Sequence, residues 1–334
     1  MKIGAKIRQG AGIIKESLGD ALREEEILPL EKRVRIALSS KQVRKAALED
    51  FSYTFVQIGM ERLGAQRLAG AIIGRMVNYV DSHYDRQQAI LNDRAVISTP
   101  YDPFYLDRKA AARFLRRITS TEDEVASLLE AARINGRPLV EALRKKLSDR
   151  KYKVAEQIGP FLAGTSGKIL DYGAGSGMNA QHLHDALNLD VEAVDIRDFK
   201  SPSVGIKYRT WNNKRIPVDD NYYECSFATN VLHHEVNNFR IIRELTRVTK
   251  SKIVLIETVP ESESIEDYCR TFLNDVLWNR FFNRAEIPVP GRYESAEGWI
   301  KRFGDKGWKC TRSEALGYDQ PTIRDLHHLL VFER

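Results

Sequence analysis

The chain has 334 residues, of which 43% are hydrophobic and 29% are charged. This is the composition of an ordinary globular protein, and it excludes a disordered, collagen-like or disulfide-stapled chain. No stretch approaches the ~18 uninterrupted apolar residues that a membrane-spanning helix needs, and the first residues lack the apolar core of a signal peptide. We therefore expect a cytoplasmic protein without a transmembrane segment, divided into about two domains.

The net charge of +6 comes from the first part of the chain. Residues 1–150 contain 27 basic and 20 acidic residues, whereas residues 151–334 contain 25 and 26. Such an excess is found on proteins that bind polyanions and also on solvated helical surfaces, so both interpretations stay open. The three cysteines are isolated, and no Cys/His cluster has the spacing of zinc ligands. The sequence therefore predicts no metal site.

Residues 1–150 have the pattern of successive helices. Apolar residues recur at three- and four-residue steps over residues 51–80, which predicts a helix there. Pro103 and Thr121 mark the starts of two more, and Pro138 opens a helix that we expect to end near Leu147. We expect residues 1–150 to form a helical N-terminal domain that serves as a lid, as a docking module or as a homodimer interface.

From residue 151 to residue 334 the pattern is that of an α/β domain. Short apolar runs alternate with helical patterns, as is typical of a parallel sheet covered by helices. The last two runs are joined by a loop without a helix, which predicts an antiparallel hairpin. An aromatic insert at about residues 261–295 either covers a substrate site or packs against the N-terminal helices. The expected strands are residues 168–172, 191–196, 206–210, 225–229, 252–257, 308–316 and 327–333.

A glycine-rich loop follows the first of these strands. Asp171 precedes Gly173, Gly175 and Gly177, after which a helical pattern begins. Glycines permit a tight turn and let a ligand approach the free N–H groups of a helix N-terminus. The dinucleotide fingerprint G-x-G-x-x-G fails, because a methionine stands where its third glycine is required. An acidic residue before the loop suits a cationic amine better than a diphosphate, and Asp195, at the end of the next strand, can accept hydrogen bonds from ribose hydroxyls.

These motifs resemble those of the class I S-adenosylmethionine-dependent methyltransferases, most closely the group with small-molecule, quinone and natural-product methyltransferases. The resemblance covers about residues 150–334 and implies a Rossmann-like sheet of seven mostly parallel strands, in the order 3-2-1-4-5-7-6 with the last strand antiparallel. It also implies S-adenosylmethionine as the cofactor. The family's adenine-contacting acid is replaced by Asn212, which can still accept from the adenine amino group. The residues that the resemblance places at the cofactor are Asp171, Gly173, Ala174, Gly175, Gly177, Asp195, Ile196, Asn212 and Asn230.

Three side chains are candidates for a general base. Methyl transfer is an in-line displacement, so a base is needed only if the acceptor must lose a proton. His233 and His234 follow the fourth strand and resemble the segment where this group often carries a histidine pair, while Glu257 ends the fifth strand. All three lie at the carboxyl edge of the expected sheet, where open α/β proteins bind ligands. The alternative is that the histidines cap the strand or pack on the cofactor.

The sequence thus predicts a methyltransferase that acts on a small-molecule or lipid-like acceptor. The Asn/Asp-Pro-Pro-Tyr motif common in enzymes that methylate exocyclic or amide nitrogens is absent after the fourth strand, and no Pro-Cys pair could supply the thiolate of cytosine-C5 methylation. Two alternatives stay open. One is a nucleic-acid methyltransferase that holds phosphates with its basic N-terminal half. The other is a non-catalytic protein that keeps the methyltransferase fold.

Overall fold

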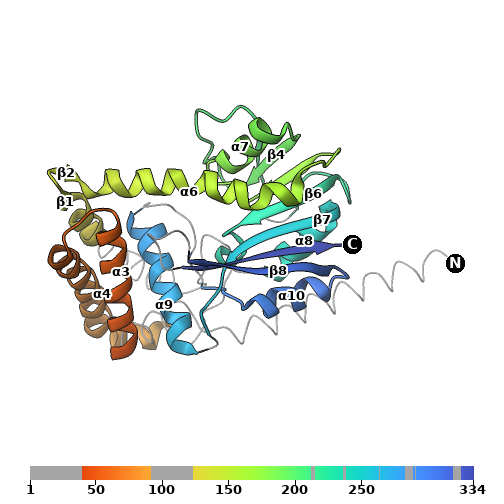
Figure 1. The fold of residues 1–334 in the computed structure, drawn as a ribbon. Helices are drawn as coiled ribbons and strands as arrows, with labels where there is room; N and C mark the ends of the chain where they lie inside the picture. The colour runs from red at the N-terminus through yellow and green to blue at the C-terminus, as the bar shows by residue number, and fades with distance from the viewer. Residues whose placement is uncertain are drawn as a thin grey trace.

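The computed structural model describes residues 40–91, 123–211, 215–235, 238–262, 264–282, 289, 291–318 and 325–334. An α/β unit with a central sheet forms the C-terminal part, and a group of helices lies beside it (Figure 1). The predicted helix starts at Pro103 and Thr121 lie outside these residues. No helix in the described part of the chain is long and apolar enough to cross a membrane.

The first two described helices are α3 (Lys41–Gln57) and α4 (Arg62–Leu91). The Ser40 side chain caps α3 by accepting a hydrogen bond from the backbone N–H of Val43 at 3.2 Å. The single helix predicted over residues 51–80 is therefore wrong. The chain breaks at Gly59, whose φ of 103° is incompatible with a continuous helix, although the apolar periodicity resumes beyond it.

A long helix, α6 (Leu139–Leu162), connects the helical part to the sheet (Figure 1). It follows a short hairpin of β1 (Arg133–Ile134) and β2 (Arg137–Pro138). The predicted end near Leu147 is wrong by about four turns, because buried apolar positions continue through Val154 and Ile158 after a polar stretch. The predicted domain boundary at residue 150 falls inside this helix, and the division itself stays a prediction.

The sheet has the predicted topology. Its seven strands lie in the order β5-β4-β3-β6-β7-β9-β8, which is 3-2-1-4-5-7-6 when they are numbered along the chain, and only β9 runs antiparallel to the others. The register of the parallel strands brings the end of β3 level with the ends of β4 and β6. The strands are β3 (Ile169–Tyr172), β4 (Val191–Asp195), β5 (Lys207–Thr210), β6 (Tyr223–Thr229), β7 (Thr249–Thr258), β8 (Lys309–Tyr318) and β9 (Leu326–Glu333).

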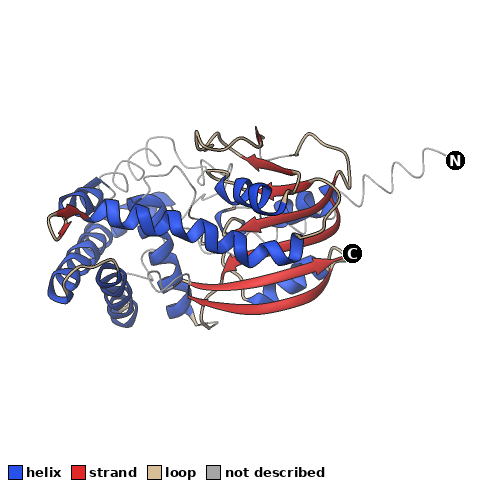
Figure 2. Ribbon diagram, turned by 45° about the horizontal axis from the view of Figure 1, so that its top comes forward, coloured by secondary structure: helices blue, strands red, loops and turns tan. Residues whose placement is uncertain are grey.

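Helices cover both faces of the sheet (Figure 2). The C-terminal half of α6 and α7 (Met178–Leu187) pack on one face through residues such as Ile158 and Leu183. On the other face, α8 (Asn238–Val248) and α10 (Ala296–Gly304) bury Leu245 and Trp299. The inner strands are largely buried because both faces of the sheet are covered, whereas the edge strands β5 and β8 are mostly exposed or half-buried.

The predicted aromatic insert contains α9 (Ile265–Val276) and η2 (Leu277–Phe282). Leu273 and Trp278 are buried in the same apolar cluster as Phe51 and Ile72 of the N-terminal helices. The insert therefore packs against these helices, which is one of the two arrangements that the sequence left open. Phe272 belongs to a separate small cluster with residues 289 and 293, so α9 is buried on two sides.

Candidate active site

The glycine loop between β3 and α7 turns tightly at the carboxyl edge of the sheet. Gly173, Gly175 and Gly177 have φ values of 68°, 51° and 74°, a region that L side chains rarely adopt. A Cβ on Gly173 would collide with the side chain of Val231, which follows β6. A Cβ on Gly175 would instead meet nothing within 4 Å. The loop is thus packed tightly at its start and open at its centre, where a ligand can approach the backbone.

Asp195 at the end of β4 holds this loop in place. Its Oδ2 accepts a hydrogen bond from the N–H of Gly175 at 2.7 Å, and its Oδ1 accepts from the N–H of Ile196 at 2.6 Å. Burial raises the pKa of Asp195, and the backbone hydrogen bonds oppose this shift. A carboxylate has about four acceptor positions, and the N–H groups of Gly175, Ile196 and Arg197 use three of them, so acceptor capacity remains for a ligand hydroxyl.

Asp171 in β3 has a buried carboxylate that is only partly satisfied. Its side chain is 1% exposed, and Oδ2 has no hydrogen-bond partner among the described residues. Burial and the nearby Asp195 raise the pKa of Asp171 well above its usual range, and the backbone N–H of Ala180 opposes this shift. A cationic group would satisfy the open oxygen and remove the repulsion between the two acids. The site therefore has the electrostatics expected for the amino group and ribose of S-adenosylmethionine.

Lys151 reaches the glycine loop from α6, a contact that the sequence reasoning missed. Its ammonium donates a hydrogen bond to Oγ of Ser176. Burial, followed by the neighbouring Arg150, lowers the pKa of Lys151. The sequence does not predict this contact. The helix that begins at Pro138 is expected to end near Leu147, so the position of Lys151 relative to the glycine loop is not defined.

The remaining predicted cofactor residues lie around this loop. The N–H of Ala174 donates to the carbonyl of Val194 at 3.2 Å, and Ile196 packs with the apolar cluster beneath the sheet edge. Asn230 follows β6 with a φ of 54°, and its Oδ1 accepts from Oγ1 of Thr258 at 3.3 Å. Asn212 lies outside the described residues.

Two of the three candidate base residues are in direct contact. His233 lies in η1 (Leu232–His234), the short helix after β6, and its Nδ1 is 2.6 Å from Oε2 of Glu257 at the end of β7. Oε1 of Glu257 accepts from the backbone N–H groups of Val231 and Leu232, at 3.0 and 2.8 Å. Burial opposes the charged form of His233, but Glu257 and Asp275 outweigh this effect and raise its pKa. The fully buried Glu257 thus fixes both the position and the orientation of the imidazole.

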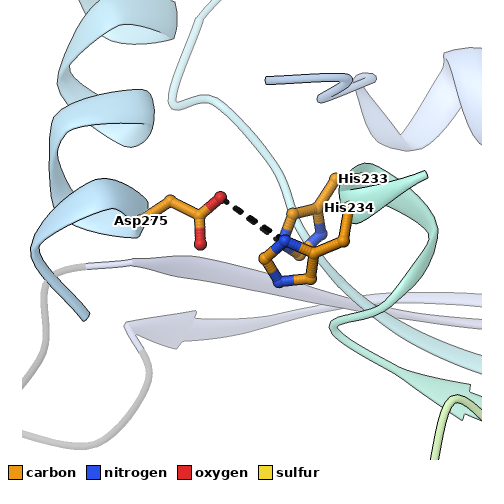
Figure 3. A group of neighbouring side chains, drawn as sticks. All are labelled: His233, His234 and Asp275. Carbon is orange, nitrogen blue, oxygen red and sulfur yellow. Dashed lines mark ion pairs between the residues drawn. The ribbon is translucent and has the colours of Figure 1, made fainter. Parts of the chain in front are cut away.

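Asp275 on α9 completes this group, and sequence reasoning did not identify it. Its Oδ2 lies 4.0 Å from Nε2 of His233 and 3.9 Å from Nδ1 of His234. Figure 3 shows its carboxylate, from one side, directed at the two imidazoles on η1. Tyr293 donates to Oδ2 at 2.5 Å, and Nδ2 of Asn279 donates to Oδ1 at 2.5 Å. The one available signal was an acidic residue within an apolar, aromatic helix, 41 positions beyond His234.

Comparison with known families identifies the central part of the chain. Residues 170–256 match the family model for a methyltransferase domain. This part of the chain is similar to a methyltransferase domain. The matched segment includes the glycine loop, Asp195 and the two histidines of η1, and it ends one residue before Glu257. The methyltransferase domain and its strand order agree with the class I fold and with the S-adenosylmethionine cofactor predicted from the sequence.

Several solved structures resemble the methyltransferase domain at low sequence identity. A SAM-dependent methyltransferase from Aquifex aeolicus is 17% identical with a TM-score of 0.38, over 55% of this chain and 88% of that chain. A chain from the complex of the Haloferax volcanii Trm112 methyltransferase activator with a methyltransferase is 13% identical with a TM-score of 0.43, over 56% and 92%. Magnesium protoporphyrin IX methyltransferase from Synechocystis PCC 6803, with bound SAH, is 13% identical with a TM-score of 0.42, over 68% and 100%. A search of curated proteins finds no match.

Proposed function

We propose that this protein transfers the methyl group of S-adenosylmethionine to a small-molecule or lipid-like acceptor. One observation carries the proposal: the open glycine loop, with the partly satisfied carboxylate of Asp171, lies at the same edge of the sheet as the His233–Glu257 pair. Cofactor-binding groups and a candidate base therefore come from adjacent strands, β3 and β6. When it is bound, S-adenosylmethionine supplies a methyl group activated by a positively charged sulfur.

The residues around the glycine loop have the chemistry to hold this cofactor. Asp171 pairs with the ammonium group, which gives its Oδ2 the partner that it lacks among the described residues. Asp195 accepts hydrogen bonds from the ribose hydroxyls with the lone pairs that the loop leaves free. Lys151, already at the loop through Ser176, is placed to bind the cofactor's carboxylate. Gly175 leaves space for the ligand to lie against the backbone.

The acceptor side is built from η1 and the insert. The contact between Nδ1 of His233 and the carboxyl group of Glu257 directs the other ring nitrogen, Nε2, toward α9. This nitrogen, or the more exposed His234, takes the proton of a hydroxyl acceptor. Phe272 and Tyr293 in the insert form an apolar cluster next to the imidazoles. We propose that this cluster covers the acceptor and excludes water, which favours an apolar or ring-containing molecule.

Titration calorimetry with S-adenosylmethionine and S-adenosylhomocysteine tests the cofactor site. We expect Asp171→Asn to weaken binding of S-adenosylmethionine by about 10- to 100-fold, since a buried charged hydrogen bond is lost. The matched control is Asp185→Asn, the same change on the exposed side of α7, where Asp185 accepts a hydrogen bond from Gln181. Absence of binding to the unmodified protein, or equal affinity in the Asp171 variant, would disprove the assignment. Release of S-adenosylhomocysteine across a panel of hydroxyl, carboxyl and amine acceptors then tests for turnover.

A further inference from the structure

We propose that His233, His234 and Asp275 bind a divalent transition-metal cation. Each residue offers one ligand atom, and in the described part of the chain these three atoms all lie within 4.8 Å of one another. They come from two elements, η1 and α9, that are separated by α8 and β7 in the sequence (Figure 3). The sequence alone predicted no metal, because spacing between ligands is informative only when they lie on one element or motif. The cation site itself does not depend on the proposed function, but its role with the acceptor does.

The separations fit a shared ion better than direct hydrogen bonds. The distances from Oδ2 of Asp275 to Nε2 of His233 and Nδ1 of His234, 4.0 and 3.9 Å, are too long for hydrogen bonds. A cation bonded at ~2.1 Å to each atom would hold them about 3.0–3.4 Å apart, so each side chain needs to move by less than about 1 Å. Movements of this size require only small side-chain rotations.

The surrounding hydrogen bonds already orient the ligand atoms. Glu257 binds Nδ1 of His233 and is itself held by two backbone N–H groups, so Nε2 is the nitrogen turned toward Asp275. A carboxylate behind a histidine in this way is the usual outer partner of a metal-ligating imidazole. Asn279 and Tyr293 similarly fix the carboxylate of Asp275. The cluster thus has both its ligands and the groups that support them.

A purely structural ion pair explains these positions less well. If His233 served only to pair with the two acids around it, its Nε2 would lie within hydrogen-bond distance of Asp275, as its Nδ1 does for Glu257. Instead, Asp275 takes its short hydrogen bonds from Tyr293 and Asn279. A divalent cation there would also balance the charges of the two buried carboxylates.

Such a cation identifies the class of acceptor. Two histidines and one carboxylate leave coordination positions for water and for an oxygen of the acceptor. When both imidazoles bind the cation they cannot take the proton, and the cation replaces them in that role by lowering the pKa of a bound hydroxyl, which loses its proton to solvent. The acceptor oxygen then forms the bond to the methyl carbon, the carbon–sulfur bond breaks, and sulfur keeps the electron pair. We therefore infer a hydroxyl acceptor.

Cobalt titration of the full chain, without a histidine tag and after EDTA treatment, tests the site. We expect a 1:1 complex with visible Co²⁺ absorption that Zn²⁺ displaces. His234→Ala and Asp275→Asn should weaken binding by at least about tenfold, whereas His328→Ala, a control histidine that pairs with Ser313 on β8, should leave it unchanged. No 1:1 binding, or equal affinity in all three variants, would overturn the proposal.

Two further measurements keep the result interpretable. The Tm of each variant without cation shows whether it is folded, and only proteins with the site should gain Tm when Zn²⁺ is added. Calorimetry with S-adenosylmethionine on the same samples separates the two proposals. Cofactor binding without cation binding overturns the metal site alone and leaves His233 as the base, whereas absence of cofactor binding overturns the proposed function.

Discussion

The buried carboxylate of Asp171 leads to a prediction about stability as well as binding. The side chain lies buried beside Asp195, and its Oδ2 has no hydrogen-bond partner among the described residues. Its pKa is raised in the folded protein, so the folded state holds this proton more tightly than the unfolded state does. The contribution to stability is therefore favourable at low pH and is lost as the pH rises through the raised pKa. An asparagine side chain does not ionise, so Asp171→Asn avoids this loss of stability. The variant should be more stable than the wild type in the absence of ligand.

We expect a gain of about 0.5–2 kcal/mol, typical of relieving one unfavourable buried group. For a domain of this size, 1 kcal/mol corresponds to ~2–4 °C, so Tm should rise by about 1–8 °C at neutral pH. The advantage should shrink as the pH falls toward the unfolded-state pKa of ~3.9, below which the wild-type carboxyl is protonated in both states. Saturating S-adenosylmethionine should reverse the order, because only the wild type binds it tightly.

Thermal denaturation followed by circular dichroism, between pH 5 and pH 8 with and without cofactor, measures all of these effects. Asp185→Asn, on the exposed side of α7, is the control and should not change Tm at either pH. An Asp171→Asn protein that is less stable than wild type across the pH range would refute the electrostatic reasoning. An equal cofactor-induced rise in Tm for both proteins would refute the role of Asp171 in binding.

Three further predictions concern the loop, the insert and β9. Gly175→Ala should cost about 1 kcal/mol for its positive φ and weaken cofactor binding at least about tenfold, by calorimetry, because its methyl group enters the open space. Arg270→Ala should lower the free energy of unfolding in urea by about 3 kcal/mol, since it leaves Asp50 buried without its bidentate partner, whereas Lys45→Ala in an exposed pair should cost less than ~0.5 kcal/mol. Burial, and then Arg150, lowers the pKa of His327 well below its usual value, so the folded state keeps this imidazole neutral. The protein should lose stability as the pH falls below ~6.5, and a shallower loss in His327→Gln, measured by urea denaturation at pH 5 and pH 7, is the expected result.

The parts of the site that could be predicted from sequence are those built by neighbouring residues. The loop from Asp171 to Gly177 joins one strand to one helix, and Asp195 follows at the end of the next strand, so their juxtaposition follows from strand order alone. His233 and Glu257 could be placed at the same edge for the same reason, since parallel strands end together. Their direct contact depends on the turn of η1, which the spacing of apolar residues in the sequence does not predict.

The parts that could not be predicted depend on packing between distant segments. Lys151 reaches the loop only because α6 continues past a polar stretch, and Asp275 meets the histidines only because α9 folds back over the sheet edge. Gly59 interrupts a periodicity that otherwise predicts a continuous helix. In each case the contact that fixes the local structure involves residues distant in the sequence, so a local sequence pattern cannot predict it.

The continuity of α6 has a consequence for how the two parts of the molecule communicate. The N-terminal end of this helix is buried among the N-terminal helices through Leu139 and Leu143, and its middle carries Lys151 onto the glycine loop. A continuous helix transmits rotation along its length. Any partner that repositions the N-terminal helices therefore also moves Lys151 at the glycine loop. By thermodynamic reciprocity, occupancy of the cofactor site must alter the affinity of the helical part for that partner by the same factor.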